Sequence, residues 1–168
     1  YPLRRQRQMC IRDSPYYSLT RSEIDPLTGC TVCSEDQEIV LIGTLKPFHI
    51  CHKIAPKIKE IIGKLYQEGE PIFTVTGYRV SKTRNPLNKH GNRTGFSNHS
   101  YGTAIDINRE QNGLYDNCFK FGPECKLIQG GRRKARVPGT LEKNGKIVRS
   151  MIESGFKWGG EIEGKQKD

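Results

Sequence analysis

The sequence predicts an α+β fold in which helices pack on a small, mainly antiparallel sheet. Two helix candidates and several short strand candidates occur in the 168 residues, and they lack the regular strand-helix alternation of a parallel sheet. No internal repeat or heptad pattern is present. Hydrophobic residues make up 34% of the chain, which is sufficient for one core of ordinary domain size.

The first half of the chain contains the clearest helix signal. Short strands are predicted at Glu38–Gly43 and Ile72–Val75, where apolar and β-branched residues cluster. Between them, three- and four-residue spacing of apolar residues predicts an amphipathic helix over Lys53–Glu68, ended by Gly69. Residues 80–98 are polar and are expected to form a long loop. The apolar stripe of the helix comprises Ile54, Ile58, Ile61, Ile62, Leu65 and Tyr66.

The second half is predicted to be less regular. Thr103–Ile107 is expected to form a strand, and residues 109–139 a long irregular insertion. A short helix is predicted at Lys146–Ser154, with Gly155 ending it. A final strand is expected at Phe156–Trp158.

Three regions are expected along the chain. Residues 1–14 are interpreted as a non-native tail, because Gln8–Ser14, read back into codons, resembles the mosaic-end adapter of transposon-based sequencing libraries. The alternative is an ordinary basic tail. Residues 15–44 are expected to form an irregular arm, and residues 45–168 the functional domain.

The chain is strongly basic. Lys and Arg number 28 against 18 Asp and Glu, so the formal net charge is +10. This excess favours polyanionic partners such as nucleic acid, anionic lipid or anionic cell-wall polymer. No apolar run approaches the roughly 18 residues that a membrane span needs.

The most informative segment is S-N-H-S-Y-G-T-A-I-D-I-N, residues 97–108. In an extended chain His99 and Asp106 would lie about 23 Å apart. A turn at Gly102 can bring them together, which would place an imidazole and a carboxylate within reach of one Zn²⁺. On spacing alone, a structural histidine is the more ordinary interpretation.

The pattern S-x-H-x-x-G-x-A-x-D resembles the zinc peptidases of bacterial cell walls. These are the D-alanyl-D-alanine carboxypeptidases and dipeptidases and the L-alanyl-D-glutamate endopeptidases. The preceding amphipathic helix, the motif T-G-Y-R and the late motif G-F-x-W-G-G occur in the family's order across residues 45–168. The resemblance implies a Hedgehog/DD-peptidase-like fold and hydrolysis of an amide bond in peptidoglycan stem peptides by metal-activated water. It also implies a periplasmic or extracellular location.

Carried over by motif, the resemblance implies that His99 and Asp106 bind Zn²⁺ and that Arg79 of T-G-Y-R reaches the scissile carbonyl. A guanidinium can stabilise the oxyanion of a tetrahedral intermediate. The alternative for Arg79 is a surface arginine at the end of a strand. Ser97 matches a serine near the substrate, and could equally cap the turn.

The resemblance places the general base at Asp168, with Glu161 as the competing carboxylate. In the family a histidine three residues beyond this acid completes the zinc site, so the chain is expected to end before its third ligand. His49, His52 and His90 are interpreted as solvent-facing or structural. Two ligands make a weak site, and this polypeptide is therefore expected to hold zinc poorly.

The cysteines outside the tail favour disulfides over a structural zinc site. In an exported protein Cys118 and Cys125 would staple the long insertion, and either Cys30 or Cys33 could pair with Cys51. The alternative is a structural zinc site whose four ligands are Cys30, Cys33, Cys118 and Cys125.

The run G-G-R-R-K-A-R, residues 130–136, concentrates four cations in one predicted loop. It is either solvated or an electrostatic contact for anionic wall polymer. Two rival functions stay open: a non-catalytic metal-containing binding module of the same fold, and a basic nucleic-acid-binding domain. The second has less support in the sequence, since no nucleic-acid-binding motif or aromatic array accompanies the run.

Overall fold

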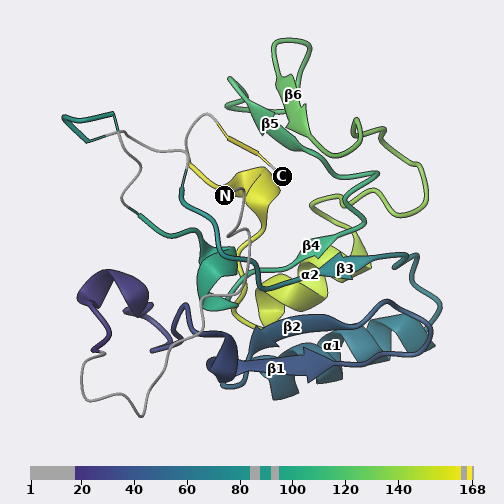
Figure 1. The fold of residues 1–168 in the computed structure, drawn as a ribbon. Coiled ribbons are helices and arrows are strands. Elements are labelled where there is room, and N and C mark those ends of the chain that lie inside the picture. Colours follow the sequence, from purple (N-terminus) through teal and green to yellow (C-terminus); the bar gives the residue numbers. More distant parts are fainter. Residues whose placement is uncertain (1–17, 84–87, 92–94, 164–165, 168) are drawn as a thin grey trace. The chain divides into compact units, whose positions relative to one another are not determined.

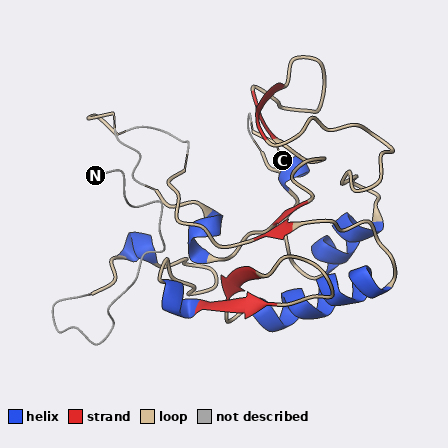
Figure 2. Ribbon diagram, turned by 45° about the vertical axis from the view of Figure 1, so that its right-hand side comes forward, coloured by secondary structure: helices blue, strands red, loops and turns tan. Residues whose placement is uncertain are grey.

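The computed structural model describes residues 18–83, 88–91, 95–163 and 166–167 and has an α+β fold. The proposed tail, residues 1–14, and Asp168 lie outside the described residues. Short helices and two- to four-residue strands are separated by long loops (Figures 1 and 2). No helix in the described part of the chain has the length and apolar character that crossing a bilayer requires.

The chain divides into two compact units. The first comprises residues 1–42, 46–59 and 76–106. The second comprises residues 43–45, 60–75 and 107–168.

The first unit is organised around an antiparallel strand pair. Strand β1 (Gln37–Val40) pairs with β2 (Phe48–Cys51), and Ile39 lies opposite His49. Lys59 forms an ion pair with Glu38 of β1. The predicted strand is thus confirmed in shorter form, and its partner β2 was not predicted.

The segment expected to be an irregular arm is packed into the first unit. It contains two short 3₁₀ helices, η1 (Arg21–Glu23) and η2 (Ser34–Asp36). Val32 is fully buried, and a disulfide joins Cys30 to Cys51. Cys33 is also buried and disulfide-bonded. The expected disulfide to Cys51 is therefore confirmed, and the alternative cysteine zinc site is wrong.

Helix α1 (Ala55–Gln67) confirms the strongest sequence signal. Ile58, Ile62 and Leu65 are buried at three- and four-residue spacing, as an amphipathic helix requires. Gly69 has φ +78°, the left-handed conformation that commonly follows the last helical turn.

The second unit contains helix α2 (Lys146–Glu153), followed by Gly155 at φ +92°, as predicted. It also contains an antiparallel hairpin of β5 (Leu114–Asp116) and β6 (Lys126–Gln129). The expectation of a wholly irregular insertion over residues 109–139 is therefore wrong. A three-residue strand offers too little alternation to be recognised from sequence, and the Cys118–Cys125 disulfide closes the hairpin's connection.

Three other strand predictions change in the structure. Ile72–Val75 and Thr103–Ile107 reduce to β3 (Val75–Thr76) and β4 (Asp106–Ile107), which pair with each other. Phe156–Trp158 is not a strand. Its last residue, Trp158, instead occupies the N-cap position of the 3₁₀ helix η4 (Gly159–Glu161).

Asn108 is the main polar connection in the core of the second unit. Its side chain is nearly inaccessible, at 1%. Its Oδ1 accepts from the N–H groups of Phe73 (2.7 Å) and Thr74 (3.1 Å), and its Nδ2 donates to the carbonyls of Pro71 (2.6 Å) and Gly139 (3.0 Å). One side chain therefore satisfies four backbone groups of two loops.

We expect Asn108→Ala to lower the free energy of unfolding by about 3 kcal/mol, because it leaves the buried Gly139 carbonyl and three part-buried backbone groups without their side-chain partner. Asn108→Asp should lose at least as much, because it keeps the acceptor for Phe73 and Thr74 but turns a buried carboxylate oxygen toward the Pro71 and Gly139 carbonyls. Urea unfolding followed by circular dichroism measures both. A loss below about 1 kcal/mol for the alanine variant would contradict this role.

Candidate metal and catalytic site

The 3₁₀ helix η3 (Asn98–Tyr101) carries His99, and Gly102 ends it at φ +66°. A Cβ on Gly102 would lie 1.9 Å from Gln37 Oε1 and 2.6 Å from the Cys51 nitrogen. Its carbonyl accepts a hydrogen bond from that nitrogen at 2.9 Å. Gly102 thus turns the chain against β2, and β4 then presents Asp106.

The turn brings the two predicted ligands together. His99 Nε2 lies 3.1 Å from Asp106 Oδ1, and both side chains are mostly buried. Two donors on one tetrahedral zinc ion, each about 2.1 Å from it, lie roughly 3.4 Å apart. The pair therefore fits two positions of a zinc site with little adjustment.

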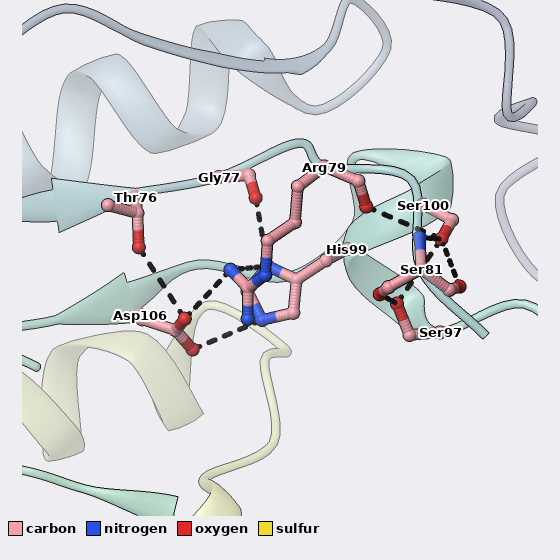
Figure 3. A network of polar contacts seen from close by, with 8 residues as sticks. All are labelled: Thr76, Gly77, Arg79, Ser81, Ser97, His99, Ser100 and Asp106. Carbon is pink, nitrogen blue, oxygen red and sulfur yellow. Dashed lines mark hydrogen bonds and ion pairs between the residues drawn. The ribbon is translucent and has the colours of Figure 1, made fainter. Parts of the chain in front are cut away.

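The Gly77 carbonyl orients the His99 ring. His99 Nδ1 lies 2.9 Å from this oxygen and 3.1 Å from Arg79 Nη1 (Figure 3). The Gly77 carbonyl can only accept a hydrogen bond, so it pairs with a protonated Nδ1. The Arg79 guanidinium can only donate, so it pairs with an unprotonated Nδ1. Donation to Gly77 is the arrangement that leaves the Nε2 lone pair for a metal, with the backbone as outer support.

Arg79 pairs with the same carboxylate. Its Nη1 lies 2.9 Å from Asp106 Oδ2, and Thr76 Oγ1 lies 3.5 Å from that oxygen. Burial by itself raises the pKa of Asp106, but the hydrogen bond and charge of His99 and the charge of Arg79 outweigh it and hold the pKa at about 2. Asp106 is therefore ionised at neutral pH, as metal coordination requires.

Three serines join the segment that follows Arg79 to η3 (Figure 3). Ser100 is fully buried, and its Oγ accepts from the Ser81 N–H at 2.8 Å and donates to the Ser81 carbonyl at 2.6 Å. Ser81 Oγ lies 2.7 Å from Ser97 Oγ. Ser97 occupies the N-cap position of η3 without a side-chain capping bond. The expected capping is absent, and its contact with substrate stays a prediction.

The described residues supply only these two predicted ligands. They contain no group of three or more His, Cys, Asp or Glu side chains arranged to hold a metal ion. His52 Nδ1 lies 3.0 Å from the Asp36 carbonyl, and His90 is exposed. The competing carboxylate Glu161 lies in η4 of the second unit and pairs with Lys143.

Some of the site could not be found from sequence. The Gly77 carbonyl lies within the motif that drew attention to Arg79, but a backbone oxygen has no signature of its own. Ser81 and Ser100 lie in a polar loop and beside the histidine motif, where serines are ordinary. Their pairing depends on two segments meeting in the fold.

An imidazole and a carboxylate thus lie side by side, with a guanidinium paired to the carboxylate. Residues 90–166, a little less than half of the chain, match the family model described as D-alanyl-D-alanine carboxypeptidase. The matched span includes His99 and Asp106 but not Arg79. The match supports a peptidase that acts on cell-wall peptides. No solved structure matches the chain.

We expect Gly102→Ala to destabilise the protein by about 2–4 kcal/mol, because a Cβ would overlap Gln37 in a left-handed conformation. Gly91→Ala is the control, since Gly91 has φ +77° and no atom within 4 Å of a Cβ. It should lose only about 1 kcal/mol. Equal losses in urea unfolding would show that crowding at Gly102 is unimportant.

Proposed function

We propose that this protein is a Zn²⁺-dependent peptidase that hydrolyses an amide bond in peptidoglycan stem peptides. The observation that carries the proposal is the 3.1 Å approach of His99 Nε2 to Asp106 Oδ1, inside the span that matches the carboxypeptidase family. The primary activity is D-alanyl-D-alanine carboxypeptidase-like, with L-alanyl-D-glutamate endopeptidase activity as the alternative. When bound, Zn²⁺ polarises the scissile carbonyl and lowers the pKa of a coordinated water.

His99 and Asp106 hold the metal in this proposal. The Gly77 carbonyl supports the assignment, because it accepts a hydrogen bond from the Nδ1–H and leaves the Nε2 lone pair for the metal. The guanidinium of Arg79, 2.9 Å from Asp106 Oδ2, supports it as well, because it favours the ionised carboxylate that a metal requires.

Arg79 stabilises negative charge on the scissile carbonyl oxygen. Its side chain is 43% exposed, so a bound peptide can reach it, and its ion pair with Asp106 keeps it beside the metal ligands. A guanidinium has five donors. One can hold Asp106 while another meets the developing oxyanion.

The remaining roles rest on the resemblance. Ser97 contacts the substrate next to the histidine, and Asp168 moves the proton from water to the leaving amine. Glu161 is the competing base, and its ion pair with Lys143 favours a structural role. The third metal ligand is not among the described residues.

A location outside the cytoplasm fits this substrate. The two disulfides Cys30–Cys51 and Cys118–Cys125 are typical of proteins that fold in an oxidising compartment. The peptide substrate of the proposed reaction belongs to the cell wall, so the protein is assigned to the periplasm or the extracellular wall.

A non-catalytic metal-binding module of the same fold is the second candidate. The observation that favours it is the presence of two ligands, rather than three, among the described residues. Such a module would bind Zn²⁺ at the same pair and leave stem peptides intact.

We expect His99→Ala and Asp106→Ala each to reduce D-alanine release from a pentapeptide stem by more than about 100-fold, because each removes a metal ligand. The affinity for zinc, measured by equilibrium titration, should fall in parallel. His90→Ala replaces an exposed histidine of the same unit and should change neither. Full activity in either ligand variant would refute the peptidase assignment, and zinc binding without hydrolysis by the wild type would favour the binding module.

We expect Arg79→Ala to lower kcat by about 10²–10³ while zinc content is unchanged, because the lost group acts on the transition-state oxyanion. Arg79→Lys should recover part of the rate, since it retains the charge and loses the planar fork. Steady-state kinetics and metal analysis on the same preparations test this. Loss of zinc in the alanine variant would show that Arg79 serves to hold Asp106.

A further inference from the structure

The loop that follows β6 carries a concentrated positive charge. Four cations and no acid lie between Gly130 and Leu141. The site described above does not include this loop. In the structure one of these side chains is partly buried and the other three are exposed.

Arg133 is the partly buried cation, and its contacts are structural. Its Nη2 donates to the Leu141 carbonyl at 3.0 Å, and its guanidinium lies 4.8 Å from the ring centre of Phe121. Its backbone N–H donates to Tyr115 Oη at 2.6 Å. Arg133 therefore anchors the middle of the loop.

The loop is also held at both ends. The Gly131 N–H donates to the Arg109 carbonyl at 3.0 Å. Near the other end, Asn112 Nδ2 donates to the Gly139 carbonyl at 2.8 Å and its Oδ1 accepts from the Leu141 N–H at 2.7 Å. The intervening residues are thus displayed from a hydrogen-bonded frame, which reduces the entropy lost when a ligand binds.

The other three cations are Arg132, Lys134 and Arg136. All three are exposed, and none forms an ion pair within the described part of the chain. Arg136 has φ +63°, a conformation unusual for a residue with a side chain, and its N–H donates to Glu142 Oε1 at 2.9 Å. By contrast, Lys146 of α2 pairs with Glu68 at 2.9 Å.

We propose that Arg132, Lys134 and Arg136 form a docking surface for a linear phosphodiester polymer of the cell wall. Two guanidinium groups and one ammonium suit successive phosphates, because arginine binds a phosphate through paired donors. The choice of a wall polymer over nucleic acid rests on the proposed function and on the two disulfides, which place the protein outside the cytoplasm. The surface would hold the enzyme on the wall while its separate site acts on peptides.

Binding of this kind is electrostatic and depends on salt. Each phosphate contact contributes about 0.7 to the slope of log K against log salt for a flexible single-stranded polyanion. Three contacts therefore account for a slope of about 2.

The experiment measures binding of the full chain to immobilised poly(glycerol phosphate) at several salt concentrations. The variant Arg132→Gln/Lys134→Gln/Arg136→Gln should bind at least about tenfold more weakly at low salt and show a slope smaller by about 2. The control variant is Lys46→Gln/Lys57→Gln/Lys64→Gln. It lowers the net charge by the same amount, at three exposed lysines outside the loop. It should bind nearly as the wild type does.

Equal weakening in both variants would overturn the proposal, because it would show general attraction by net charge. Tighter binding to double-stranded DNA with the same number of phosphates would overturn the choice of partner. Two further measurements separate this proposal from the peptidase assignment. His99→Ala should bind the polymer normally, and the loop variant should cleave a short soluble stem peptide at the wild-type rate.

Discussion

The close approach of Gly77 to the His49 carbonyl is the constraint on which the site depends. A Cβ at position 77 would lie 2.1 Å from that oxygen, which also accepts the Tyr78 N–H at 2.7 Å. Only glycine allows the T-G-Y-R segment to lie against β2 in this way. From that position the Gly77 carbonyl reaches His99 and Arg79 reaches Asp106, so a single backbone contact places both halves of the site.

The site keeps a carboxylate ionised in partly buried surroundings. Burial opposes the charge on Asp106, and His99 and Arg79 compensate for it. The consequence is a carboxylate and an imidazole whose donor atoms already lie at nearly the spacing that one ion requires. Pre-positioned donors would reduce the reorganisation that binding of the proposed metal requires, and the proposed role of Arg79 couples these donors to the charge that develops on the substrate.

Polar side chains, rather than long strands, organise the second unit. Asn108 bonds to the Pro71 and Gly139 carbonyls, and Asn112 bonds to Gly139 and Leu141. Strands of two to four residues contribute few inter-strand hydrogen bonds. The side-chain amides of Asn108 and Asn112 therefore bond to backbone N–H and carbonyl groups that would pair between strands in a larger sheet. The same bonds fix the frame from which the basic loop displays its cations.

Features that depend on neighbours along the chain were predictable from sequence. The helix periodicity around Ile58 and Ile62 was sufficient for α1, and the His99–Asp106 motif with its intervening glycine was sufficient for a candidate ligand pair. Only the tertiary structure decided which distant groups meet. The pairing of Ser81 with Ser100 and the short β5–β6 hairpin have no local signal, because their stability comes from partners that are adjacent only after folding.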